Sequence, residues 1–187
     1  DADRHVVNSC QRGVRIALRP DVPSERDPTL KMHVVFVVDA THSMKSMCQG
    51  NTGKAAVHSI LDNVATGVAA HLSSMDEEQR VLVQKTTDFA FASFGKYPRW
   101  VVGAEREEDQ FVSADVLGAH CIHVKSMLEF SDDRTDIASA MLFATEALRS
   151  RMTPPSMGQE ATGTRHVGAI VLLTDGIQNA GDIGTAA

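Results

Sequence analysis

An uninterrupted apolar run is the strongest pattern in the chain. Residues 34–38 read Val-Val-Phe-Val-Val, and Asp39 follows at once. Such a run of β-branched and aromatic residues is typical of a strand covered on both faces of a parallel sheet. We therefore predict a buried central strand here. Ligand sites in open α/β sheets lie just beyond the carboxyl ends of such strands.

Periodic patterns predict the other main elements. Apolar residues of segment 54–72 recur at helical spacing, which predicts a helix over one face of the sheet. Segment 89–95 alternates aromatic and small residues up to a glycine and is expected to be a central strand. Segment 137–148 has apolar residues at 4-3-4 spacing and predicts a second helix. Segment 166–173 predicts another strand buried on both faces, so the pattern indicates an α/β fold.

The remaining segments carry weaker signals. Residues 77–80 are expected to be a polar break, and residues 81–83 fit either a helical turn or a short strand. Residues 97–102 are expected to be an edge strand or hairpin arm, because proline is tolerated only at a sheet edge. Acidic residues 105–109 and segment 152–163 are expected to be surface loops.

The first thirty residues form a proline-rich N-terminal extension and linker, with a possible accessory strand over residues 14–18. The main domain is expected to span residues 31–187. Within it, residues 50–54 resemble a phosphate-binding loop, but Cys48 and Ala55 stand where that loop needs glycine and a hydroxyl. His120 and His123 are read as structural residues, because no matching pair of metal ligands is visible.

Oxygen-bearing side chains directly follow the central strand. Asp39, Thr41 and Ser43 recur at every second residue, so their side chains can point into one crevice. Hard oxygen ligands suit Mg²⁺, with Mn²⁺ or Ca²⁺ as alternatives, better than zinc or copper. By itself the pattern is weak, and a helix N-cap is its ordinary explanation. His42 lies between these positions and is expected at the rim.

Two further segments strengthen the metal hypothesis. Residues 134–136 (Arg-Thr-Asp) open a helix, and residues 172–176 (Leu-Leu-Thr-Asp-Gly) close the last strand. With the Asp-x-Thr-x-Ser loop, they resemble the three parts of the metal ion-dependent adhesion site of the von Willebrand factor type A family. The resemblance covers residue 31 to the end of the chain. Thr41 stands where most members have serine, although some intracellular members carry threonine.

The resemblance implies a doubly wound, mostly parallel, Rossmann-like sheet flanked by helices. It also implies that Thr135 binds the metal directly or through water, that Asp175 binds through water, and that Asp136 lies in the surrounding shell. A helix cap at Thr135 or Asp136, and a simple Asp-Gly turn at Asp175, are the alternatives. The family fold continues with another helix and one or two strands, so the C-terminal elements are missing, or the strand edge is covered by something else.

Composition limits the function classes. The chain has 187 residues, 43% hydrophobic content, a net charge of −6 and a pI near 5.7, which fit one acidic domain and disfavour nucleic acid. No apolar run is long enough to cross a bilayer. Three cysteines, Cys10, Cys48 and Cys121, are expected to be reduced, which favours a reducing compartment but leaves the localisation open. The missing signal peptide is uninformative, because the chain starts without Met.

These patterns predict a metal-dependent protein-binding module, part of a larger protein or complex, that takes an Asp or Glu carboxylate of another protein. No general base or activated nucleophile accompanies the site, so catalysis is not expected. One alternative is a scaffold subunit with a non-functional metal site. Another is a Mg²⁺-dependent phosphatase of the haloacid dehalogenase type, but Thr41 replaces the second aspartate that this class needs.

Overall fold

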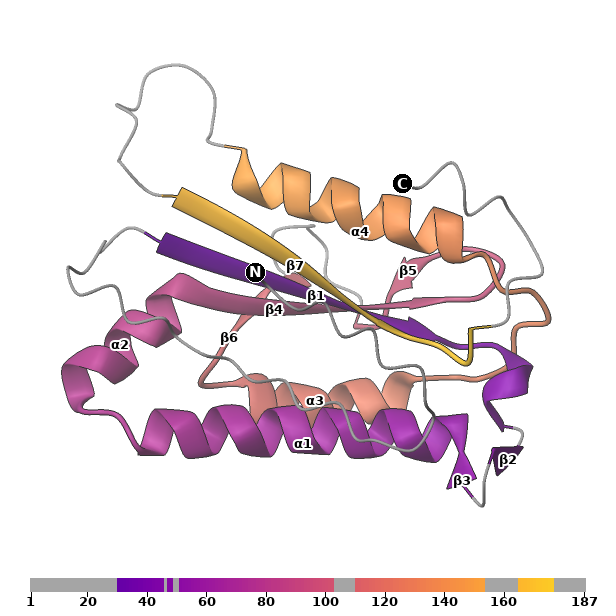
Figure 1. Ribbon diagram of the computed structural model, residues 1–187, viewed down its shortest axis with the longest axis horizontal. Helices are drawn as coiled ribbons and strands as arrows, with labels where there is room; N and C mark the ends of the chain where they lie inside the picture. Colours follow the sequence, from indigo (N-terminus) through magenta and orange to yellow (C-terminus); the bar gives the residue numbers. More distant parts are fainter. Residues whose placement is uncertain (1–29, 46, 49–50, 103–109, 154–164, 177–187) are drawn as a thin grey trace, which may run out of the picture.

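The chain folds into a mixed β-sheet flanked by helices, an α/β architecture (Figure 1). The computed structural model describes residues 30–45, 47–48, 51–102, 110–153 and 165–176. None of the helices in these segments is long and apolar enough to cross a membrane.

The sheet is built around β1 (Leu30–Asp39), which pairs in parallel with β4 (Thr87–Phe94) on one side and β7 (Arg165–Leu173) on the other. Two short strands, β5 (Arg99–Trp100) and β6 (Val112–Ser113), pair antiparallel with β4. The strand order is β5-β4-β1-β7. Because the three long strands are parallel, their carboxyl ends meet at one edge of the sheet.

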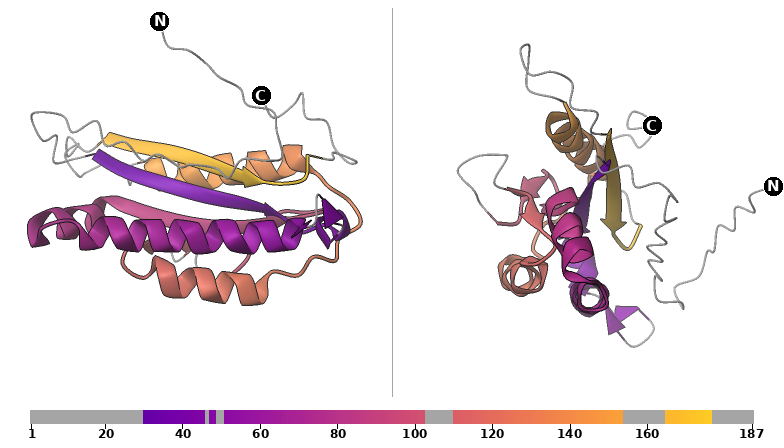
Figure 2. Two further views of the ribbon diagram at one scale, coloured as in Figure 1. Left: turned by 60° about the horizontal axis from the view of Figure 1, so that its bottom comes forward. Right: turned by 90° about the vertical axis from the view of Figure 1, so that its left-hand side faces the viewer.

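Helices cover both faces of the sheet. Figure 2 shows α1 (Gly53–Ser73) and α3 (Leu117–Met127) on one side and α4 (Ile137–Met152) on the other. Alternate residues of β1 supply the two cores: Val34, Phe36 and Val38 pack towards α1 and α3, whereas Val35 and Val37 pack towards α4. The uninterrupted apolar run in the sequence is thus explained by burial on both faces.

Smaller elements connect this frame. The 3-10 helix η1 (His42–Lys45) follows β1, and the short hairpin strands β2 (Met47–Cys48) and β3 (Asn51–Thr52) lead into α1. Thr52 caps α1 by accepting a hydrogen bond from the Ala55 amide at 3.1 Å. Helix α2 (Glu77–Thr86) precedes β4.

The central strand, the two predicted helices and the alternating strand are confirmed as elements. The bounds of α1 and β4 agree within two residues, the usual spread of element boundaries. Strand β1 begins four residues earlier than predicted, and α4 ends four residues later. The polar break at residues 77–80 was wrong: these residues begin α2. Asp76 caps this helix through the Gln79 amide at 2.8 Å, and acidic residues fill its first turn. Polar composition there reflects an exposed helix rather than a loop.

Two other expectations need correction. Segment 166–173 is not buried on both faces: β7 lies at an edge of the sheet in the described part of the chain, and Val167 is 47% exposed. Helix α3 was not predicted. Its buried residues Leu117, Cys121 and Val124 have helical spacing, but the exposed apolar residues Ile122 and Met127 obscure that pattern. Residue 152, expected in a loop, ends α4.

Several predictions fall outside the described residues. They concern the N-terminal extension with Cys10, the acidic segment 105–109, most of the loop before β7, and the end of the chain. The side chain of Cys48 is not described either. Cys121 is a buried free thiol, as predicted, and burial raises its pKa to about 11. It is therefore an unreactive core residue.

Candidate metal-binding site

The carboxylate of Asp39 is the centre of a small hydrogen-bond network at the carboxyl end of β1. Asp39 is fully buried. Its Oδ1 accepts hydrogen bonds from the Thr41 amide at 2.9 Å and from Thr41 Oγ1 at 2.6 Å. Thr41 Oγ1 in turn lies 2.9 Å from Ser43 Oγ. The structure therefore brings together the three residues that the alternate spacing singled out.

The end of β7 reaches the same carboxylate. Thr174 Oγ1 donates to Asp39 Oδ2 at 2.7 Å and accepts a hydrogen bond from the Gly176 amide at 3.0 Å. Gly176 has φ +83°, a conformation that glycine adopts without strain. Between them Asp175 is exposed. Thr174 was not among the predicted ligands, although its place directly after a parallel neighbour of β1 is a signal that could have found it.

A third segment is bound to this edge through its backbone. The Asp132 carbonyl accepts from the His42 amide at 2.8 Å, and the Asp132 amide donates to the Ala40 carbonyl at 3.3 Å. Thr41 and Asp132 form an isolated parallel bridge. The segment before α4 thus lies beside the residues that follow the carboxyl end of β1, next to the predicted ligands. His42 itself is exposed, as expected for a rim residue.

The other end of this segment is fixed at the start of α4. The Asp136 amide donates to the Gly95 carbonyl at 3.0 Å. The Asp136 carboxylate caps α4 by accepting from the Ser139 amide at 3.0 Å and from Ser139 Oγ at 2.8 Å. The ordinary capping role is therefore confirmed for Asp136. Thr135, which precedes it, is buried, and its role as a metal ligand remains a prediction.

The close approach of Gly95 and Asp132 holds the third segment in place. A Cβ at position 95 would overlap the side chain of Asp132. We expect Gly95→Ala to lower the free energy of unfolding by about 1–3 kcal/mol, the usual cost of overpacking. Gly67 in α1 is the matched control, because a Cβ there meets nothing within 4 Å. Gly67→Ala should be neutral or stabilising. Equal urea midpoints for both variants would contradict this reading of Gly95.

The electrostatics of the site are unusual for a protein interior. In the described part of the chain no Lys, Arg or His forms an ion pair with Asp39. All its hydrogen bonds come from hydroxyls and one amide. A buried anion without a compensating charge is costly. A cation among these oxygens would supply the compensation, so the residues fit a hard divalent ion.

No group of three or more His, Cys, Asp or Glu residues that could hold a metal occurs among the described residues. The predicted set is of another kind, because it contains two carboxylates and three hydroxyls. His120 and His123 lie on α3, and the ring centroid of His120 lies 5.5 Å from that of Phe91. This contact supports a structural role for His120.

Comparison with known proteins shows only the fold. No family model and no curated protein matches the chain. Among solved structures, the PilB minor pilin from Streptococcus sanguinis aligns with TM-score 0.50 and 19% identity, over 82% of this chain and 31% of the pilin. An aspartate-to-alanine mutant of that pilin aligns with TM-score 0.50 and 17% identity, over 85% and 32%. The chain therefore spans about a third of the length of these pilins.

Proposed function

We propose that this chain is a von Willebrand factor type A-like domain that binds a partner protein through a divalent cation, without catalysis. The cation, Mg²⁺ or Mn²⁺, would be held by Asp39, Thr41 and Ser43 after β1, Thr135 before α4, and Asp175 after β7. The observation that carries the proposal is the buried Asp39 carboxylate, which is surrounded by hydroxyls and has no ion pair within the described residues.

The fold supports this proposal. In the family, the strand corresponding to β4 lies beside the first strand, and β4 pairs with β1 here. The three parts of the motif come from distant parts of the chain, yet each is tied to the carboxyl edge of the sheet by hydrogen bonds. A shared ion would require the three segments to meet in this way. Their meeting depends on the fold and cannot be read from any one segment of the sequence.

The chemistry of the ligands determines what the site can do. A bound divalent cation would supply a positive charge and an open coordination position. The chain's own part is to hold Asp39 rigidly, to present neutral hydroxyls instead of further carboxylates, and to keep Asp175 exposed at the rim. Because few anions neutralise the ion, a carboxylate from a partner can complete its coordination.

The names of the structural neighbours favour a role in assembly. Both are described as a minor pilin, and this chain corresponds to about a third of each. An adhesion or assembly role within a larger protein or complex is consistent with that likeness. A scaffold with a non-functional metal site is the second candidate, because the hydroxyl and amide donors already satisfy both oxygens of Asp39.

Acetate tests the proposed function directly, because it carries the carboxylate that a partner would offer. We expect the Mn²⁺-loaded protein to enhance the relaxation of the acetate methyl protons, since the paramagnetic ion would bind acetate in its open position. Asp39→Asn should abolish the effect. Asp62→Asn is the charge-matched control: Asp62 is exposed on α1 and pairs only with Lys125 among described residues, so its loss should leave the effect intact.

Two outcomes would count against the proposal. Manganese binding without acetate relaxation would mean that the ion has no open position for a partner. If the wild-type protein shows no metal binding and no acetate relaxation, the result would favour the scaffold.

A further inference from the structure

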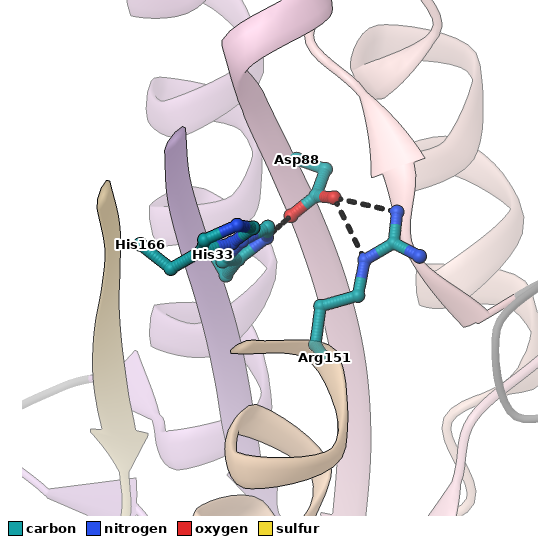
Figure 3. A network of polar contacts seen from close by, with 4 residues as sticks. All are labelled: His33, Asp88, Arg151 and His166. Atoms are coloured by element: carbon teal, nitrogen blue, oxygen red, sulfur yellow. Dashed lines mark hydrogen bonds and ion pairs between the residues drawn. The ribbon is translucent and has the colours of Figure 1, made fainter. Parts of the chain in front are cut away.

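A second polar cluster lies at the opposite, amino ends of the same strands (Figure 3). His33 of β1 is buried, and its Nδ1 lies 2.6 Å from Oδ1 of Asp88 on β4. Its Nε2 lies 2.9 Å from Nδ1 of His166 on β7, with the two rings only 14° from parallel. Arg151 of α4 donates to Asp88 Oδ2 from Nε at 3.2 Å and Nη2 at 2.9 Å. Three strands and a helix therefore meet in one network.

The network borders a polar cavity of about 190 Å³. Its charged and titratable lining comes from every element around it: Lys31, His33, Lys85, Asp88, Arg151 and His166. Asp88 is the only carboxylate among them, and both its oxygens are already engaged by His33 and Arg151. Arg151 balances the charge of Asp88, so the two lysines leave the cavity positively charged.

The protonation states agree with this charge balance. Burial would raise the pKa of Asp88, but the hydrogen bonds from His33 and Arg151 outweigh it and hold the pKa below its ordinary value. Asp88 is therefore ionised at neutral pH. Burial lowers the pKa of His166, and the nearby positive charges of Lys31 and Arg151 lower it further. His166 thus lies in a positive potential that an anion would relieve.

We propose that this cavity binds a small tetrahedral oxyanion of the phosphate class between Lys31, Lys85 and His166. The cavity of about 190 Å³ is smaller than pockets for drug-sized molecules, which are about 300 Å³ or larger, so its ligand should be small. The lining carries more positive than negative side chains, so the ligand should be an anion. This site does not depend on the proposed metal site, which lies at the other end of the strands.

The hydrogen-bond chain gives His166 a defined role. With Asp88 ionised, His33 donates from Nδ1 to that carboxylate, and its Nε2 then accepts from Nδ1 of His166. Within the described part of the chain, Nε2 of His166 has no hydrogen-bond partner, so a proton on this atom can be donated to an oxyanion. Binding should therefore favour the imidazolium form of His166, and affinity should rise as the pH falls.

Titration with inorganic phosphate, followed through the His166 ring signals by NMR, tests the site. We expect saturable shifts at pH 7 and a loss of affinity of about tenfold in Lys85→Ala, the typical effect of removing one charge-assisted contact. Lys96→Ala removes the same charge from an exposed position beside Tyr97, outside the cavity, and should leave the affinity unchanged. Unchanged melting temperatures would show that both variants are folded.

Sulfate serves as the probe for pH, because its charge stays constant where phosphate titrates. Because the pKa of His166 is lowered below its ordinary value of 6.5, sulfate affinity should increase as the pH falls towards and below that value, and His166→Gln should remove the dependence. Absence of saturable shifts, equal loss in the two lysine variants, or a pH dependence that survives in His166→Gln would each overturn the proposal.

Discussion

Asp39→Asn is expected to abolish the stabilisation of this protein by Mg²⁺. At a free Mg²⁺ concentration one hundred times the dissociation constant, the wild-type protein should gain about 2.7 kcal/mol in free energy of unfolding. The variant should gain nothing, because an amide is a poor ligand for a hard cation in place of the carboxylate. Urea unfolding with Mg²⁺ and with chelator measures both values.

The amide keeps the shape of Asp39, so the variant should still fold without metal. Its oxygen can accept from Thr41, and its nitrogen can donate to Thr174 Oγ1, reversing the bond that Asp39 Oδ2 now accepts. Asp62→Asn should respond to Mg²⁺ like the wild type. A Mg²⁺ response that survives in Asp39→Asn would place the ion elsewhere.

Phe36→Ala is expected to be the most destabilising single truncation in the core. Phe36 is 1% exposed, and its ring lies nearly parallel to that of Phe91 on β4, with centroids 5.0 Å apart. Truncation removes this contact and leaves a cavity between the sheet and α1. We expect a loss of about 3–5 kcal/mol in free energy of unfolding, measured by urea unfolding.

The exposed Leu142 of α4 provides the control, since its side chain is 52% exposed. Leu142→Ala should change stability by no more than about 0.5 kcal/mol. A loss below about 1 kcal/mol for Phe36→Ala would contradict a core built on both faces of β1. The candidate ligands are positioned by the carboxyl ends of β1 and β4. Weaker packing of these strands should therefore also weaken metal binding.

The sequence could predict those parts of the fold in which local pattern and burial agree. Strand β1 reads as continuous apolar residues because both faces are covered, and α1 has helical spacing because one of its faces packs on the sheet. The alternate spacing of Asp39, Thr41 and Ser43 likewise produces side chains that contact one another. In each case the signal and its structural cause lie within one short segment.

Other features depend on contacts between distant segments, which periodicity does not report. Thr174 donates to Asp39 from 135 residues away, and Gly95 matters only because Asp132 approaches it. The polar residues of α2 resemble a loop until its cap is seen. The apolar residues of β7 indicate two buried faces, although in the described residues the strand lies at an edge. His33 joins Asp88 and His166 only once three strands are aligned.

Calorimetric titration of Mg²⁺, and of Mn²⁺ in parallel, into the metal-free protein is the most direct measurement of the central claim. We predict one binding site per chain, with the heat abolished in Asp39→Asn and retained in Asp62→Asn. No binding heat in the wild-type protein with either cation would contradict a metal site at the end of β1.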